Sequence, residues 1–191
     1  ITILSDKSIA IADTFNNAIR ISKNGQISTL VRSSSNNKLI GDLSDIWLRK
    51  PLALAAGSKE GVIFTIEAPS IIRKKIGNSI FLTAGNPNDA GFLNGPIKIA
   101  LFRYPSGVFE REKGEVIVSD SNNSCIRRIK NQTVTTLAGM CTVSGYRDGP
   151  SNSALFKFPI GIQPSVKGEI LVADARNNRI RSIGKDGVVS T

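Results

Sequence analysis

Short runs of apolar, largely β-branched residues alternate with polar and glycine-containing turns along the whole chain. Residues 115–119 form one such run, introduced by Gly114, and the runs at 126–129 and 133–137 follow after brief polar segments. Together with the apolar stretch after Pro105, they predict four short strands joined as an antiparallel meander. No window has apolar residues at helical spacing over the ~10 residues that a helix needs, so an all-β fold is expected.

The same pattern returns at a fixed interval. Residues 100–108 recur at 154–162, and residues 114–120 recur at 168–174, a shift of 54 positions in both cases. Such self-similarity indicates repeated supersecondary units, each burying its apolar faces against its neighbours. We therefore expect a single domain whose repeats span approximately 1–50, 51–104, 105–158 and 159–191.

Several segments carry the signature of a known repeat. Asp-Thr-Phe-Asn-Asn-Ala-Ile-Arg at 13–20, its counterpart at 174–181, Thr-Thr-Leu-Ala-Gly at 135–139 and Gly-Tyr-Arg-Asp-Gly at 145–149 resemble the NHL repeat. The second unit departs from it at Glu67, where aspartate is replaced, and lacks the asparagine pair. The resemblance implies a β-propeller of four-stranded antiparallel blades, usually six to a ring. About four units are present, and ends that fall inside repeat elements favour part of a larger ring.

The charge balance is strongly basic, with 25 Lys and Arg against 15 Asp and Glu and a formal net charge of +10. This permits attraction to acidic protein surfaces, RNA or anionic glycans. Histidine is absent, which removes the commonest general base and transition-metal ligand, so neither a catalytic site nor a metal or other cofactor is expected. The longest apolar runs fall short of the ~20 residues that would span a bilayer, so no transmembrane segment is expected.

Two columns of basic residues recur at equivalent positions of the repeats. One lies within the third strands and comprises Arg20, Arg73, Arg127 and Arg181. We expect these to lie between blades and to bond carboxylates or carbonyls through their guanidinium forks. The other column lies two residues before the blade-opening prolines and comprises Arg49, Arg103 and Lys157. These three either form a basic arc at the channel mouth, or each stays solvated or pairs with a carboxylate such as Asp45 or Asp148.

The meander places the loops between second and third strands on the same face as the long connections 31–50, 86–104 and 140–158. Long loops on a rigid scaffold are where binding usually occurs. The candidate binding residues on this face are the second basic column together with Arg147, Arg176 and Asn177. The strand-end aspartates, Asp13, Asp120 and Asp174, are expected to hydrogen-bond the loops that follow them.

The two cysteines fall near one another in the predicted meander. Cys125 begins a third strand, and antiparallel pairing puts it opposite residues 137–139, within reach of Cys141 if the chain curls. A disulfide and two buried free thiols are both compatible with this placement. A disulfide would indicate an oxidising compartment, and the glycosylation sequons at Asn122 and Asn131 fit one. The sequence leans towards a secreted or lumenal setting and leaves a cytoplasmic one open.

Three functions compete. The first is a non-enzymatic protein-interaction or scaffolding module acting through the loop-rich face, since the repeats show no converging acid, base or nucleophile. The second is binding of RNA or another polyanion, for which Trp47, Tyr104 and Tyr146 are the plausible stacking residues. Trp47 aligns with leucines of the other repeats and is expected in the core. The third is a hydrolase or lyase, because similar propellers include such enzymes, although their sites rely on histidines.

Overall fold

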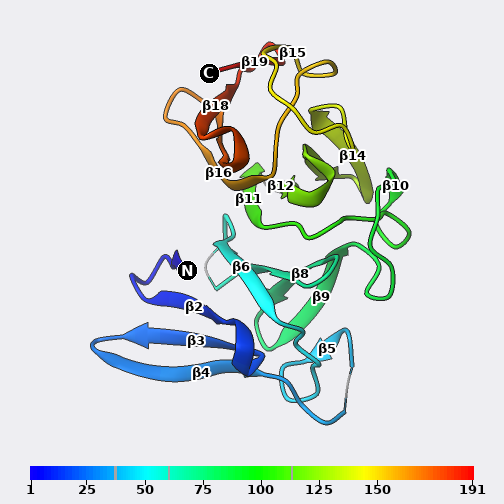
Figure 1. Ribbon diagram of the computed structural model, residues 1–191. Coiled ribbons are helices and arrows are strands. Elements are labelled where there is room, and N and C mark those ends of the chain that lie inside the picture. The colour runs from blue at the N-terminus through cyan, green and yellow to red at the C-terminus, as the bar shows by residue number, and fades with distance from the viewer. Residues whose placement is uncertain (37, 60, 113) are drawn as a thin grey trace.

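The computed structural model describes residues 1–36, 38–59, 61–112 and 114–191, and its regular structure is almost entirely antiparallel sheet. Four sheets of four or five strands follow one another in chain order as the blades of a propeller (Figure 1). The inner strands of successive blades contact one another, which arranges the sheets around a common axis. The all-β, multi-bladed architecture expected from the sequence is confirmed.

The strands of each blade follow the short apolar runs of its repeat. Blade 1 contains β1 (Thr2–Ile3), β2 (Ile9–Asp13), β3 (Ala18–Lys23) and β4 (Gln26–Arg32). Blade 2 contains β5 (Gly41–Asp42), β6 (Pro51–Ala56), β7 (Ile63–Glu67), β8 (Ile71–Ile76) and β9 (Ser79–Ala84). Blade 3 contains β10 (Gly95–Pro96), β11 (Gly107–Glu112), β12 (Glu115–Asp120), β13 (Cys125–Lys130) and β14 (Thr133–Ala138). Blade 4 contains β15 (Gly149–Pro150), β16 (Pro159–Pro164), β17 (Ile170–Asp174), β18 (Arg179–Ile183) and β19 (Val188–Ser190).

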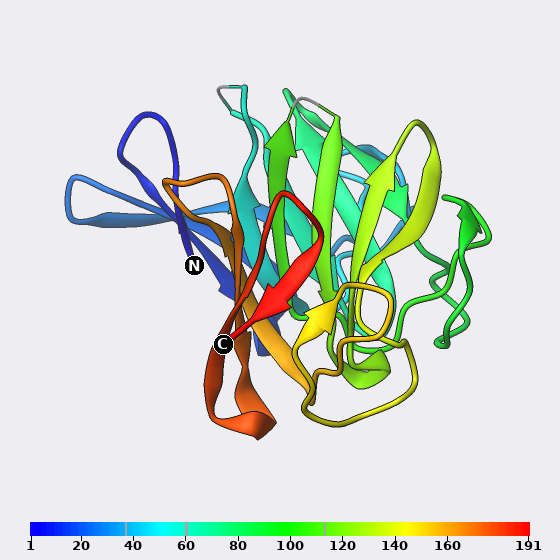
Figure 2. The ribbon, with the colours of Figure 1, turned by 90° about the horizontal axis from the view of Figure 1, so that it is seen from above.

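Three single turns of 3-10 helix lie between the second and third strands of their blades. They are η1 (Thr14–Asn16), η2 (Ser121–Asn123) and η3 (Ala175–Asn177). Figure 2 views the blades from the side, with η2 and η3 at one end and the tight turns of the same blades at the other. The ends of the blades therefore differ in character: one is built of 3-10 turns and long connections, the other of short turns.

Blades 2, 3 and 4 each carry a fifth strand of two residues that the sequence pattern did not predict. The connection between blades runs along the outer edge of the next blade before entering it at the inner strand, as the pairing of Gly95–Pro96 with β14 illustrates. An outer edge exposes unpaired N–H and C=O groups, and the short strand covers part of that edge. The expectation that residues 31–50, 86–104 and 140–158 lie wholly on one face is therefore wrong for their middle portions.

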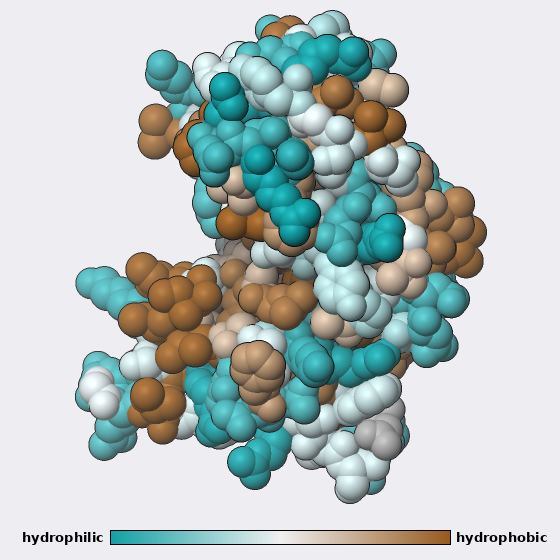
Figure 3. Space-filling model, in the orientation of Figure 1, coloured by the Kyte–Doolittle hydropathy of each residue, from teal (hydrophilic) through white to brown (hydrophobic). Residues whose placement is uncertain are grey.

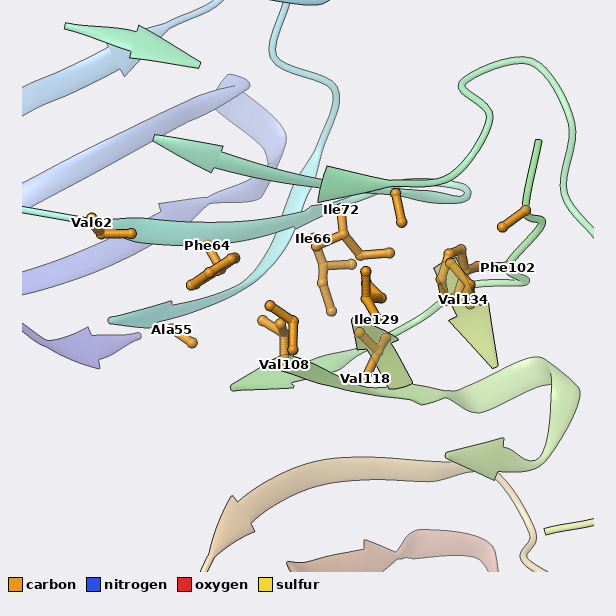
Figure 4. Close-up of a cluster of buried hydrophobic side chains, with 13 residues drawn as sticks. Ala55, Val62, Phe64, Ile66, Ile72, Phe102, Val108, Val118, Ile129 and Val134 are labelled. Atoms are coloured by element: carbon orange, nitrogen blue, oxygen red, sulfur yellow. The ribbon is translucent and has the colours of Figure 1, made fainter. Parts of the chain in front are cut away.

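Apolar side chains fill the interfaces between neighbouring blades. Between blades 2 and 3, Phe64 and Ile66 belong to the same buried cluster as Val108 and Val118 (Figure 4). Each strand presents alternate residues to its two neighbouring blades, because side chains of a strand alternate between faces. β7 and β12 lie inside the stack of blades and are buried on both faces. Both strands therefore carry apolar side chains on both faces.

The two terminal blades each keep one apolar face uncovered. Ile117 and Ile126 of blade 3 are 0% exposed and belong to the cluster shared with blade 4. Their repeat equivalents, Leu171 and Ile180, are 37% and 62% exposed because no blade among the described residues covers that side of blade 4. Blade 1 also exposes Ile27, and Figure 3 shows hydrophobic side chains gathered over this blade beside a notch in the surface.

In each of blades 2, 3 and 4, a buried arginine donates hydrogen bonds to the connection that precedes the blade. Arg127, which is 0% exposed, donates from Nη1 to Asp120 Oδ2 at 2.7 Å and to the Leu101 carbonyl at 3.1 Å. Its Nη2 donates to the Leu93 carbonyl at 2.9 Å, and its guanidinium carbon lies 4.9 Å from the ring centroid of Phe102. The expected carboxylate and carbonyl partners of this arginine column are confirmed.

The other two buried arginines repeat this arrangement. Arg73 donates to the carbonyls of Leu39 and Trp47, and Arg181 donates to those of Arg147 and Leu155. In all three blades the accepting carbonyls lie 26 and 34 residues before the arginine. The same guanidinium therefore fixes two points of every connection, and we call this cluster of arginine, carboxylate and carbonyls the arginine node.

The carboxylate of each node also holds the residue two positions before the opening proline of its own blade. One oxygen of Asp120 accepts the Arg103 backbone N–H at 2.8 Å, and Asp174 accepts that of Lys157 at 2.7 Å. The aspartates also accept an amide N–H from their following loops, as expected from the sequence; Asn123 donates to Asp120 at 2.9 Å. Burial raises the pKa of the Asp120 carboxyl and lowers that of the Arg127 guanidinium, so desolvation offsets much of their attraction.

Blade 2 preserves the node despite its degenerate sequence. Glu67 occupies the aspartate position, accepts the Arg49 backbone N–H at 2.8 Å and pairs with Arg73. The carboxylate precedes its arginine by six residues here and by seven in blades 3 and 4. Glutamate has one more methylene than aspartate, so its carboxylate still reaches the guanidinium after a loop that is one residue shorter.

Removing a buried node arginine should destabilise the fold far more than removing the exposed member of the same column. Arg127→Met leaves the Asp120 charge buried without its partner, and we expect a loss of about 3–5 kcal/mol in the free energy of unfolding. Arg20, whose side chain is 28% exposed, pairs with Asp13, and Arg20→Met should cost about 1 kcal/mol or less. Urea unfolding of both variants measures the difference; equal losses would contradict the role assigned to the node.

Candidate functional site

The loop-rich face is assembled by hydrogen bonds between the 3-10 turns and the ends of the connections. The backbone N–H of Asn122 donates to the Arg103 carbonyl, and that of Arg176 donates to the Lys157 carbonyl, both at 3.1 Å. In blade 1, Asn17 Oδ1 accepts the Lys50 backbone N–H at 2.9 Å. In blades 3 and 4 the turn therefore lies beside the junction that opens the inner strand of the same blade, whereas the turn of blade 1 lies beside the junction that opens blade 2.

The residue immediately before each blade-opening proline adopts a left-handed backbone. The φ angles of Lys50, Tyr104 and Phe158 are 40°, 48° and 54°, respectively. Residues other than glycine rarely adopt this conformation, which costs roughly 1–2 kcal/mol. Such strain concentrates at binding sites, where the surrounding structure enforces it. The sequence reasoning did not single out this column, which lies one position after the predicted basic arc.

A pocket of about 360 Å³ opens between these junctions on blades 1 to 3. Its lining comprises Asn17, Trp47, Arg49, Lys50, Ala68, Pro69 and Tyr104. Two aromatic residues, two basic residues and one asparagine are therefore among its lining residues, and no acidic residue is among those that the structure describes there. We call it the Trp47 pocket. Its volume lies at the lower end of the ~300–1,000 Å³ range of ligand sites.

The three members of the predicted basic arc differ in their surroundings. Arg49 is half-buried, places its guanidinium 4.5 Å from the centroid of the Trp47 ring and donates to the Pro87 carbonyl at 2.6 Å. Arg103 and Lys157 are exposed, and neither side chain forms a salt bridge with the described residues. Their backbones are anchored by the arginine nodes while their side chains remain free to meet a partner.

The other residues predicted on this face make contacts within the protein. Arg147 is exposed but donates from Nε to the Ser153 carbonyl at 2.7 Å. Arg176 lies 4.5 Å from the ring centroid of Phe158. Asn177 donates to the Gly145 carbonyl and to Asp174.

Asn177 therefore holds the loop together, whereas Arg176 presents a cation stacked on an aromatic ring.

The expectation that Trp47 lies in the core is wrong. Its side chain is 38% exposed, whereas Ile46 and Leu48 on either side are 0% exposed. This in-out alternation could have revealed its orientation, because neighbouring side chains of an extended segment point to opposite faces. Sequence reasoning also missed the exposure of Phe15, which lies within the first 3-10 turn and is 90% exposed. Tyr146 is 45% exposed and carries Arg179 over its ring at 4.2 Å.

A disulfide joins Cys125 and Cys141, which confirms one of the two states compatible with the sequence. It links the start of β13 to the connection that follows blade 3, and the Thr142 N–H donates to the Asn123 carbonyl at 2.7 Å beside it. The sequon asparagines, Asn122 and Asn131, are both exposed. The disulfide thus pins a connection to the same face that carries η2.

The described residues contain no group of three or more His, Cys, Asp and Glu side chains that could hold a metal ion. Within the same residues, no helix is long and apolar enough to cross a membrane. Glu67, Asp120 and Asp174, which end the second strands of their blades at this face, are 0% exposed and bonded within arginine nodes. The strand-opening junctions beside them present cationic and aromatic side chains.

Comparison with known proteins places the fold. No protein-family model matches the sequence. An auxiliary nutrient binding protein from Bacteroides thetaiotaomicron superimposes with a TM-score of 0.77 at 18% identity, over 96% of this chain and 46% of that one. Virginiamycin B lyase from Staphylococcus aureus gives 0.61 at 18% identity, over 98% and 52%. The fold is that of a β-propeller.

One curated sequence is also similar. The Arabidopsis thaliana protein SUPPRESSOR OF QUENCHING 1, chloroplastic, is 30% identical over 154 residues. The match covers 73% of this chain but 14% of that protein, and the chain spans about half the length of the solved propellers. These neighbours include both nutrient-binding proteins and a lyase, so their activities differ while their folds agree.

The left-handed backbone at Tyr104 gives a test of its strain. Replacing an exposed left-handed residue by glycine removes a steric clash that alanine retains, so Tyr104→Gly should be more stable than Tyr104→Ala by about 1 kcal/mol. Tyr146 has similar exposure and an ordinary φ, and there the order should reverse by roughly the same amount. Chemical unfolding of the four variants measures both differences; the same order at both sites would refute strain at Tyr104.

The disulfide should contribute substantially to stability. It closes a loop over a sequence separation of 16 residues, which corresponds to about 3 kcal/mol of denatured-state entropy. The double variant Cys125→Ala with Cys141→Ala should lose about that much in unfolding free energy relative to the oxidised protein. A reductant should lower the stability of the parent to nearly the same extent and leave the double variant unchanged. A reductant effect on the double variant would point to another cause.

Proposed function

We propose that this chain is a propeller of the NHL type that acts as a non-enzymatic docking module, binding an acidic segment of a partner protein through its loop-rich face. The observation that carries the proposal is the set of side chains at the three strand-opening junctions. Hydrogen bonds from their backbones to the node carboxylates hold these junctions in place, and the junctions combine cations with exposed aromatic rings. Arginine and aromatic residues are those most enriched at the energetic centres of protein interfaces.

Charge supports an acidic partner. Lys50, Arg103 and Lys157 form no salt bridge with the described residues, and the formal net charge is +10. A cationic surface accelerates encounters with an acidic one and selects against basic partners. The internal carboxylates cannot compete for these cations, because the nodes bury them beside their own arginines.

Two further features favour binding over catalysis and protein over RNA. The carboxylates that end the second strands of blades 2 to 4 are ion-paired within nodes, and the sequence contains no histidine to act as a general base. The disulfide fits an oxidising compartment, such as the cell exterior or an organelle lumen, where RNA partners are scarce. RNA binding remains the competing function, because Arg176 on Phe158 and Arg49 on Trp47 could stack with bases.

Charge reversal on the two ends of the propeller tests the proposal. Arg103→Glu with Lys157→Glu changes the loop-rich face, whereas Lys167→Glu with Lys185→Glu changes exposed turns at the opposite end. Both pairs lower the net charge equally. We expect the first pair to weaken binding of immobilised polyglutamate more than about tenfold and the second less than about threefold.

Biolayer interferometry against polyglutamate and oligouridylate, at low and physiological salt, distinguishes the outcomes. Equal weakening by both pairs would mean that attraction follows net charge alone and would overturn a dedicated face. Tight retention of oligouridylate with no retention of polyglutamate would favour RNA binding instead.

A further inference from the structure

The Trp47 pocket is assembled from three blades, and the degenerate loop of blade 2 forms one wall. Where blades 3 and 4 have a 3-10 turn after the strand-end aspartate, blade 2 has a shorter turn at Ala68 and Pro69. The position of Trp47 is occupied by leucine at 101 and 155 in the later repeats. The pocket is therefore a place where the repeats differ from one another, rather than a product of their common plan.

The Trp47 ring and the Tyr104 backbone are both held by contacts within the protein. The Arg49 guanidinium lies against the Trp47 ring and is itself held by the Pro87 carbonyl. The Tyr104 backbone N–H donates to the Pro69 carbonyl at 2.9 Å, which secures the left-handed residue. Preorganised aromatic side chains lose little conformational entropy on binding and so give more net affinity.

The polar groups of the pocket suit an anion. Arg49 and Lys50 both line it, Lys50 makes no salt bridge with the described residues, and no acidic side chain is among the lining residues. Asn17 uses its Oδ1 to accept the Lys50 backbone N–H, which leaves the amide Nδ2 able to donate. A carboxylate would meet complementary charge and a hydrogen-bond donor at the same opening.

The repeat-related position of blade 4 is already filled. Phe158, the equivalent of Tyr104, carries the Arg176 guanidinium over its ring at 4.5 Å. The 49% exposed ring of Tyr104 is not the partner of any cation–π contact among the described residues. A ligand ring or proline could take the place beside Tyr104 that Arg176 takes beside Phe158.

We infer that the Trp47 pocket is the anchor of the docking face and receives a proline or aromatic side chain flanked by carboxylates in an acidic partner segment. This inference rests on the proposed function and names the recognised chemistry. The apolar side chain would lie between Trp47 and Tyr104, while Lys50 and Asn17 would bind the neighbouring carboxylate. The volume of about 360 Å³ suits one or two side chains of an extended peptide.

The chain provides its own reporter, because Trp47 is its single tryptophan. The probe is a fluorescein-labelled peptide, Glu-Glu-Pro-Phe-Glu-Glu, and the matched controls replace every Glu by Gln or the central Pro-Phe by Gly-Ala. An unlabelled copy of the peptide should produce a saturable change in Trp47 emission, and labelled peptide should show rising anisotropy. Each control peptide should bind at least about tenfold more weakly, because it lacks either the charge or the anchor.

Variants locate the binding. Lys50→Gln and Tyr104→Ala should each weaken the acidic peptide about tenfold. Lys185→Gln, in an exposed turn at the opposite end, and Phe81→Ala, at an exposed position of β9, should change it less than about threefold. Circular dichroism verifies that each variant is folded. Comparison of two variants within the pocket and two outside it prevents a single misfolded protein from deciding the result.

The outcomes separate the inference from the function on which it rests. Binding of the acidic peptide that leaves Trp47 emission and the two pocket variants unaffected would overturn the pocket and leave the docking face intact. No binding of any acidic peptide or polyglutamate would overturn both. Saturation of the Trp47 signal by oligouridylate or a sulfated glycan, at concentrations where the acidic peptide is silent, would assign the pocket to another polyanion.

Discussion

A buried guanidinium holds together three parts of each blade that lie far apart in the chain. Through one arginine, the third strand is joined to the carboxylate at the end of the second strand and to two carbonyls of the preceding connection. The same carboxylate accepts the backbone N–H of the residue two positions before the opening proline. The arginine node therefore also positions the candidate binding residues. We expect a substitution in a node to move the residues of the loop-rich face next to it.

Blade 1 indicates what the node requires. Arg20 pairs with Asp13, but no connection precedes this blade among the described residues, and both side chains are about a quarter exposed. In blades 3 and 4 the equivalent ion pairs are fully buried. Burial of the charges is thus a consequence of the connection wrapping over them, and the connection supplies the carbonyls that make burial tolerable. Arginine, aspartate and connection act as a unit.

The sequence correctly predicted features that recur in several repeats and features that depend on residues close by in the chain. Strands, the arginine column and the reach of Cys125 to Cys141 followed from periodicity and meander geometry. The two-residue outer strands did not, because Gly41–Asp42 is too short to show any alternation. The Trp47 pocket could not be predicted from the sequence either, because it depends on a left-handed backbone at Tyr104 and on the shape of the loop at Ala68 and Pro69.

Equivalent positions of the repeats differ in whether they keep the same residue type. The node arginines keep their identity in every blade, and the three in blades 2 to 4 are completely buried. The column one position before the opening prolines keeps its left-handed backbone but changes from lysine to tyrosine to phenylalanine. A strained backbone that persists while its side chain varies is not maintained by packing of that side chain. The node beneath it holds the adjacent residue of the junction, which leaves the side chain free to vary.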